Sequence, residues 1–183
     1  LMDDGLTGID QIIADVVSVD LREFTGIENV RLVGVYETDA IGSGTGNTLI
    51  GNLLANALRG LGGQDILRSG TGNDSLYGGE GADLLFGNPG ADLLRGGVGD
   101  DALSGGYGRD TLTGGDGADQ FILAFAGQSV PGRARDTITD FTSGEDEIHL
   151  VGFMAGAVLV DAFSAAGAAE IFFDVKRERL IGD

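Results

Sequence analysis

Oxygen-bearing side chains recur at a fixed interval through the middle of this sequence. Seven aspartates follow one another every nine residues, and two asparagines continue the spacing toward the N-terminus. Carboxylate oxygens at such a strict interval are the ligands that a hard divalent cation prefers. The spacing therefore predicts a ladder of metal ligands, which comprises Asn47, Asn56, Asp65, Asp74, Asp83, Asp92, Asp101, Asp110 and Asp119.

The ladder is part of a nine-residue repeat. Nine rows run without a gap from residue 42 to residue 122, and the first position is glycine in eight rows and the fourth in seven. Glycine at these positions indicates turns whose backbone conformation a side chain would penalise. The eighth position is apolar in every row and must face a core, which comprises Leu49, Leu58, Leu67, Leu76, Leu85, Leu94, Leu103, Leu112 and Phe121.

A repeat of this period predicts an all-β fold, a parallel β-roll or β-solenoid with flanking capping strands. If two rows make one coil, residues eighteen apart lie above one another in strands about 4.8 Å apart. The aspartates then line two opposite edges, one with Asp65, Asp83, Asp101 and Asp119 and the other with Asp74, Asp92 and Asp110.

The flanks of the repeat predict further strands. Alternating apolar residues at 10–17 and 28–35 predict short strands that cover the first coil. Any solenoid needs such caps at its ends. The core of the C-terminal cap is predicted to contain Phe141, Ile148, Leu150, Phe153, Phe172 and Phe173. The chain therefore divides into N-terminal capping strands over 1–41, the β-roll over 42–122 and a C-terminal β cap over 123–183.

The carboxylate ladder is unfavourable without a cation. Unit charges about 5 Å apart repel by roughly 1 kcal/mol even in water, so the roll is expected to be weak or unfolded when no ion is bound. Calcium takes six or more oxygens, backbone carbonyls included, whereas magnesium demands tighter octahedral geometry. We therefore expect two stacked turns to enclose a calcium ion. The alternative is that the aspartates and glycines only satisfy turn preferences.

Composition excludes several other classes of function. Acidic residues outnumber basic ones 29 to 11, and the net charge of −18 disfavours nucleic acid and anionic membranes as partners. Cysteine is absent and His149 is the sole histidine, so disulfides and ordinary zinc sites lack ligands. No apolar run reaches about 20 residues, so no transmembrane segment is predicted. The HExxH, GxSxG and phosphate-loop motifs are also missing, and the chain is predicted not to be an enzyme.

The rows from Gly60 to Ile122 closely resemble the repeats-in-toxin (RTX, haemolysin-type) nonapeptide GGxGxDxUx, where U is a large apolar residue. Residues 8–52 and 136–150 resemble the segments that precede and follow the roll in that family. The resemblance implies a C-terminal module of a larger protein that leaves the cell through type I secretion machinery and folds in extracellular calcium.

The resemblance also implies where the ions bind. Calcium would lie between turns of adjacent coils, with about five ions and at most about eight. Five sites would pair Asp65 with Asp83, Asp83 with Asp101, Asp101 with Asp119, Asp74 with Asp92, and Asp92 with Asp110. Asn47 and Asn56 bring no charge to the first coil. We call each ladder residue a rung, and Gln128 stands where the next rung after Asp119 is expected. Asp136 would help to close the last site. Backbone ligands would come from Gly60, Gly62, Gly63, Gly78, Gly79, Gly81, Gly87, Gly90, Gly96, Gly97, Gly99, Gly105, Gly106 and Gly108.

Two other functions compete with a folding and secretion module. The first is an accessory module that binds an acidic polysaccharide or a cell surface through Arg59, Arg68, Arg95 and Arg109, although these four do not fall into one stacked column and are expected to be solvated. The second is a catalytic domain, for which the sequence offers no nucleophile and base. His149 alternates with apolar neighbours in a predicted strand and is expected to be solvated or packed in the cap.

Overall fold

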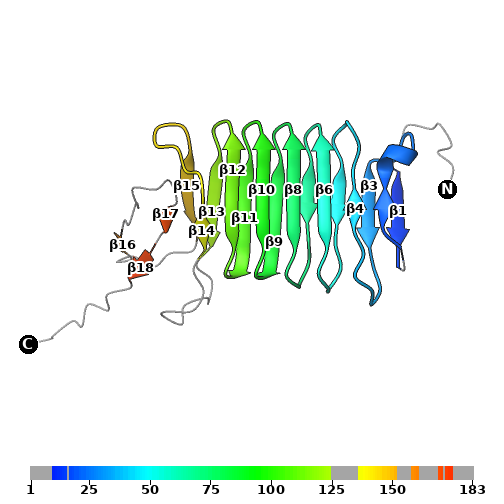
Figure 1. Ribbon diagram of the computed structural model, residues 1–183, viewed down its shortest axis with the longest axis horizontal. Coiled ribbons are helices and arrows are strands. Elements are labelled where there is room, and N and C mark those ends of the chain that lie inside the picture. Colours follow the sequence, from blue (N-terminus) through cyan, green and yellow to red (C-terminus); the bar gives the residue numbers. More distant parts are fainter. Residues whose placement is uncertain are drawn as a thin grey trace, which may run out of the picture.

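The protein is a flat roll of two β-sheets that lie face to face (Figure 1). The computed structural model describes residues 10–15, 17–124, 136–151, 158–160, 169–170 and 172–174. Within the roll, the chain passes from one sheet to the other after each strand, and the strands pair in parallel. The predicted all-β parallel β-roll is therefore confirmed.

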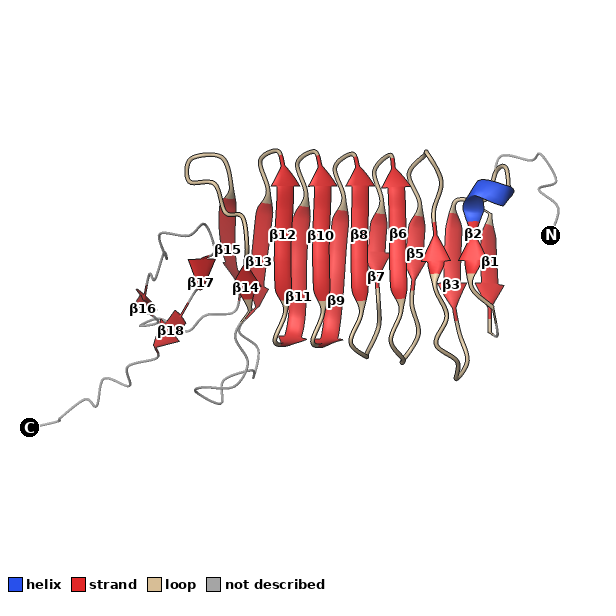
Figure 2. Cartoon of the chain, in the orientation of Figure 1, coloured by secondary structure: helices blue, strands red, loops and turns tan. Residues whose placement is uncertain are grey.

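Among the described residues, the two main sheets each contain eight strands (Figure 2). The first sheet contains β1 (Gln11–Ala14), β3 (Asn29–Leu32), β5 (Thr48–Ile50), β7 (Ile66–Arg68), β9 (Leu84–Gly90), β11 (Ala102–Gly108), β13 (Gln120–Ala124) and β15 (Glu147–Val151). The second contains β2 (Val19–Asp20), β4 (Ala40–Ile41), β6 (Ala57–Gly62), β8 (Ser75–Glu80), β10 (Leu93–Val98), β12 (Thr111–Asp116), β14 (Thr137–Ile138) and β17 (Ala169–Glu170). Strands β16 (Val158–Val160) and β18 (Phe172–Asp174) form a separate antiparallel pair, and a 3-10 helix, η1, spans Leu21–Glu23.

The core is the predicted stack of eighth-position side chains. Leu67 pairs with Leu85 and Leu85 with Leu103 in the first sheet, so residues eighteen apart do lie above one another. All nine side chains of the stack have no exposed surface. Each inward leucine is flanked by outward residues because side chains alternate between the two faces of a strand. The hydrophobic stack thus sets the register of both sheets.

Several strands extend into the glycine turns, because the turns of successive coils pair as well. Gly79 pairs with Gly97 and Gly97 with Gly115, which extends β8, β10 and β12 to six residues. The φ angle of Gly97 is 127°, and a Cβ there would collide with the carbonyl oxygen of Gly79. Glycine is required at this position for both reasons.

The parallel sheets extend beyond the repeat at both ends. Upstream, Val30 pairs with Leu49, so the lead-in strands β1 and β3 cover the first coil as further members of the first sheet. Downstream, Ile138 pairs with Leu112 and Ile148 with Phe121. These segments add coils that lack the nonapeptide motif, and the division into domains at 41 and 122 stays a prediction.

The predicted C-terminal cap core lies within the described residues only in part. Phe141 and Ile148 pack against the main core, and the ring of Phe141 lies 6.3 Å from that of Phe121. The side chains of Leu150, Phe153, Phe172 and Phe173 lie outside the described part of the chain. The C-terminal cap therefore begins as a continuation of the roll.

Candidate metal centre

The ladder aspartates line the two edges of the roll, where the chain turns from one sheet into the other. We call the turns 42–47, 60–65, 78–83, 96–101 and 114–119 the first edge, and the turns 51–56, 69–74, 87–92 and 105–110 the second edge. The first edge runs along the top of Figure 2 and the second along the bottom. The sixth residue of each turn precedes the inward leucine by two positions, so its side chain also points inward.

Each ladder carboxylate is held by one hydrogen bond to the preceding coil. The backbone N–H of Asp65 donates to Oδ1 of Asp83, and that of Asp83 donates to Oδ1 of Asp101, both over 2.8 Å. On the second edge, Asp74 donates to Oδ1 of Asp92 over 2.8 Å. The structure thus brings together the pairs of aspartates that the eighteen-residue spacing predicted.

The second oxygen of every ladder aspartate is buried without a partner. The seven residues are almost fully buried, and the Oδ2 atom of each accepts no hydrogen bond from the described residues. An unsatisfied charged oxygen in the interior costs far more than one hydrogen bond gains. These seven oxygens require either a proton or a cation, and they belong to Asp65, Asp74, Asp83, Asp92, Asp101, Asp110 and Asp119.

Burial raises the pKa of these carboxyl groups. Desolvation is the largest cause for each of the seven, and like charges on neighbouring rungs add to it for most of them. The pKa rises to about 6 for Asp119 and to about 7 for Asp65, Asp92, Asp101 and Asp110. It also rises for Asp74 and Asp83. The ladder carboxylates are therefore poorly stabilised in their ionised form when no cation is bound.

The surroundings of the unpartnered oxygens fit calcium. A Cβ atom added at Gly60 would collide with Oδ2 of Asp65 and lie 2.6 Å from the carbonyl oxygen of Gly78, so a carboxylate and a carbonyl approach one point from adjacent coils. Within the described ranges, no three His, Cys, Asp or Glu side chains cluster as metal ligands do. The remaining ligands would have to be backbone carbonyls of the glycine turns. An all-oxygen set of this kind suits calcium and not zinc.

Comparison with protein families agrees with this geometry. The model of the RTX calcium-binding nonapeptide repeat matches the chain over residues 41–76, 59–94 and 95–123. Residues 41–123 are RTX calcium-binding repeats. No catalytic family was detected, and the search of curated proteins found no match. In the described part of the chain, no helix is long and apolar enough to cross a membrane.

The first coil of the RTX repeats satisfies its own polar groups. Oδ1 of Asn47 accepts a hydrogen bond from the Ser43 N–H over 2.7 Å, and its Nδ2 donates to the carbonyl of Glu28 over 3.3 Å. Likewise, Oδ1 of Asn56 accepts from the N–H of Asn52, and its Nδ2 donates to the carbonyl of Thr38. The amides therefore end the ladder without charge and without an unpartnered oxygen. A role for either asparagine as a calcium ligand stays a prediction.

The structure adds one rung to each edge at the C-terminal end of the RTX repeats. Asp136 continues the second edge, because its Oδ1 accepts from the N–H of Asp110 over 3.1 Å and burial raises its pKa. Asp146 continues the first edge, and its two oxygens accept from the N–H groups of Asp119 and Thr142 over 3.0 and 2.7 Å. Gln128, where the sequence analysis expected this rung, lies outside the described residues.

Sequence reasoning missed Asp146, although a signal was present. In every repeat the ladder residue stands two positions before the inward apolar residue, and Asp146 stands two before Ile148. Asp140 has a different role: its oxygens accept from the N–H groups of Gly114 and Gly115 over 3.0 and 2.9 Å. That carboxylate caps the last glycine turn, where a further coil would otherwise supply carbonyls.

The predicted glycine ligands lie in the turns, but their role toward an ion stays a prediction.

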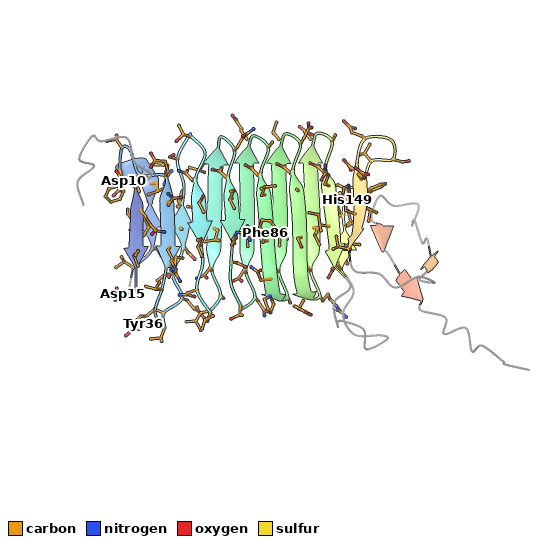
Figure 3. The ribbon with its side chains drawn as sticks, turned by 180° about the vertical axis from the view of Figure 1, so that it is seen from behind. Asp10, Asp15, Tyr36, Phe86 and His149 are labelled. Atoms are coloured by element: carbon orange, nitrogen blue, oxygen red, sulfur yellow. The ribbon has the colours of Figure 1, made fainter. Side chains whose placement is uncertain are left out.

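The arginines and the histidine that the sequence analysis considered lie on the outer surface. Arg59, Tyr77 and Arg95 are aligned on neighbouring strands, so two of the four arginines share a column, although the four together do not, as the sequence analysis expected. Arg68 lies on the opposite sheet, 4.2 Å from the ring centre of Phe86. Figure 3 places His149 at the C-terminal end of the roll, where its Nε2 lies 2.9 Å from Oε2 of Glu147.

Proposed function

We propose that this chain is a calcium-dependent folding module that supports the secretion and stability of a larger protein. The observation that carries the proposal is the set of seven buried, unpartnered carboxylate oxygens in the RTX repeats. Without a cation these oxygens oppose folding, and with calcium they bind the coils to one another. The free energy of calcium binding then becomes free energy of folding.

This dependence suits export followed by folding outside the cell. In the calcium-poor cytoplasm the chain stays unfolded and passes through a type I secretion channel. In millimolar extracellular calcium the ladders fill and the roll forms. The absence of cysteine is consistent with this route, because calcium would take the place of disulfides as the extracellular staple. On this proposal, any catalysis belongs to other parts of the parent protein.

A calcium titration tests the proposal. Chelator-treated chain is expected to lack the circular dichroism of β-structure and to gain it cooperatively on addition of calcium but not of magnesium. The double variant Asp83→Asn, Asp92→Asn removes one charge from each ladder and is expected to need roughly tenfold more calcium. Asp15→Asn is the matched control, because Asp15 is exposed and outside the repeats.

The opposite result would have a clear meaning. If the chelated chain already shows the full β signal near neutral pH and calcium changes neither the signal nor the unfolding midpoint, the aspartates act only as turn residues. The folding and secretion role would then have no physical basis.

A second candidate is the binding of an acidic polysaccharide at the outer face of the second sheet. Arg59 and Arg95 are exposed, and the guanidinium of Arg59 lies 5.1 Å from the ring centre of Tyr77. Within the described ranges the ion pairs are Arg22 with Asp20 and His149 with Glu147, which leaves Arg59 and Arg95 without a carboxylate partner. Stacked arginines present planar donors that suit carboxylate groups.

Retention on an immobilised polyuronate in calcium tests this candidate. The chain is expected to be retained, and the double variant Arg59→Gln, Arg95→Gln is expected to elute at a lower salt concentration, since two charge-assisted contacts are lost. The control is Arg22→Gln, whose arginine is already paired with Asp20. Equal elution of all three proteins would reject the binding face.

A further inference from the structure

The two edges of the roll carry different charges outside the ladder. The first-edge turns contain three exposed acidic residues that are not rungs, Glu80, Asp100 and Asp116. The second-edge turns contain no acidic residue other than the rungs, and they contain one arginine, Arg109. The hydrogen bonds from one ladder aspartate to the next have the same pattern on both edges, so they do not produce this contrast in charge.

Asp100 is the acidic residue most closely joined to the ladder. It precedes the rung Asp101, and its Oδ1 accepts a hydrogen bond from the N–H of Ala118 over 2.9 Å. Ala118 in turn precedes the rung Asp119, so the carboxylate of Asp100 spans two adjacent first-edge turns. The negative charge of Asp100 raises the pKa of both Asp101 and Asp119.

Asn73 occupies the equivalent place on the second edge. Its Oδ1 accepts from the N–H of Ala91 over 2.9 Å, and these residues precede the rungs Asp74 and Asp92. Both side chains are exposed, and their hydrogen bonds have the same length. The two positions therefore differ in charge and hardly at all in geometry.

We propose that Asp100, a residue outside the ladder, makes the first edge bind calcium more tightly than the second, so that the two rows of sites fill in sequence as calcium rises. The inference rests on the proposed function, because it assumes that ions bind between the rungs. A negative charge within one turn of a divalent ion attracts it even through water and favours binding by roughly threefold to tenfold at low ionic strength. Glu80 and Asp116 add to the same potential from the third position of their turns.

Reciprocal charge swaps test the proposal by isothermal titration calorimetry of the chelated chain with calcium at low salt. The wild-type chain is expected to show a tighter and a weaker class of sites. Asp100→Asn is expected to weaken the tighter class by roughly threefold to tenfold and to leave the weaker class unchanged. Asn73→Asp is expected to tighten the weaker class by a similar factor.

Two further measurements identify the edges and the mechanism. The rung variant Asp83→Asn is expected to reduce the tighter class, and Asp92→Asn the weaker one. At about 0.5 M salt, where the screening length falls to roughly 4 Å, the effect of Asp100→Asn is expected to shrink while that of Asp83→Asn persists. A residue that acts through its charge alone should show this difference.

The proposal is overturned if the wild-type chain has a single class of sites, or if Asp100→Asn leaves both classes unchanged or weakens them equally. Failure of the proposed function looks different, since a wild-type chain that binds no calcium at all would defeat the ladder itself. The two failures can therefore be told apart in one set of titrations.

Discussion

Acidification of the calcium-free chain from about pH 8 to about pH 5 is expected to restore its β-structure. Burial holds the pKa of Asp65, Asp92 and Asp101 at about 7 in the folded roll, whereas an unfolded aspartate titrates near 3.9. Between these values the folded state binds more protons than the unfolded state. The stability that protonation contributes is therefore fully present below about pH 4 and is lost as pH rises through about 7.

Calcium should remove this dependence. Calcium binds the carboxylates in their ionised form, so its addition is expected to restore the β signal at about pH 8 and to change the signal little at about pH 5. Circular dichroism of the desalted chain measures both trends, and the lower limit of pH 5 keeps the protein above its isoelectric point of about 4.1.

Asparagine at a rung provides the control for this pH effect. An amide cannot titrate and already closes the ladder at Asn47 and Asn56. Asp83→Asn is therefore expected to make the calcium-free chain less dependent on pH and more folded at about pH 8. A chelated chain that is equally folded at both pH values would contradict the predicted effect of the buried carboxylates.

Truncation of a core leucine is expected to cause the largest loss of stability in the calcium-bound protein. Leu85 has no exposed surface and lies between Leu67 and Leu103 in the stack. Leu85→Ala removes buried apolar surface and leaves a cavity in a core to which each repeat contributes a single large apolar side chain. The cost is about 2 to 5 kcal/mol in the free energy of unfolding, measured by urea denaturation at saturating calcium.

The adjacent residue is a matched control. Leu84 is 40% exposed on the outer face of the same strand, so Leu84→Ala is expected to cost less than about 1 kcal/mol. Equal losses for the two variants would mean that the inward leucine stack does not hold the coils together.

Much of the fold could be predicted because the same apolar and glycine positions recur in each nine-residue row. The apolar residue at the eighth position of each nine-residue row needs a core, and the glycines before it need turns, so the two parallel sheets and their register followed from Leu85 and its equivalents. The pairing of successive aspartates on two edges followed from the same register.

The ends of the ladder were harder to predict, because the period breaks there. Asp136 follows Asp110 after 26 residues and Asp146 follows Asp119 after 27, in place of 18. The strand pairing of Phe121 with Ile148 and the hydrogen bond from the N–H of Asp119 to Asp146 show that Asp146 takes the next rung. The strand pairing also aligns Arg59 with Arg95 across Tyr77, although the four arginines together do not share one column.

The sequence by itself determined the architecture, the identity of the ladder residues and the oxygen chemistry of their site, because period and residue type are local properties of the chain. Only the tertiary structure decided which oxygens have partners. In the seven ladder aspartates, Oδ1 accepts from an N–H of the coil before it and Oδ2 accepts from none, whereas the amide oxygen and nitrogen of Asn47 and Asn56 each have a partner. Hydrogen bonding between coils depends on how the coils stack, and the linear sequence does not contain that geometry.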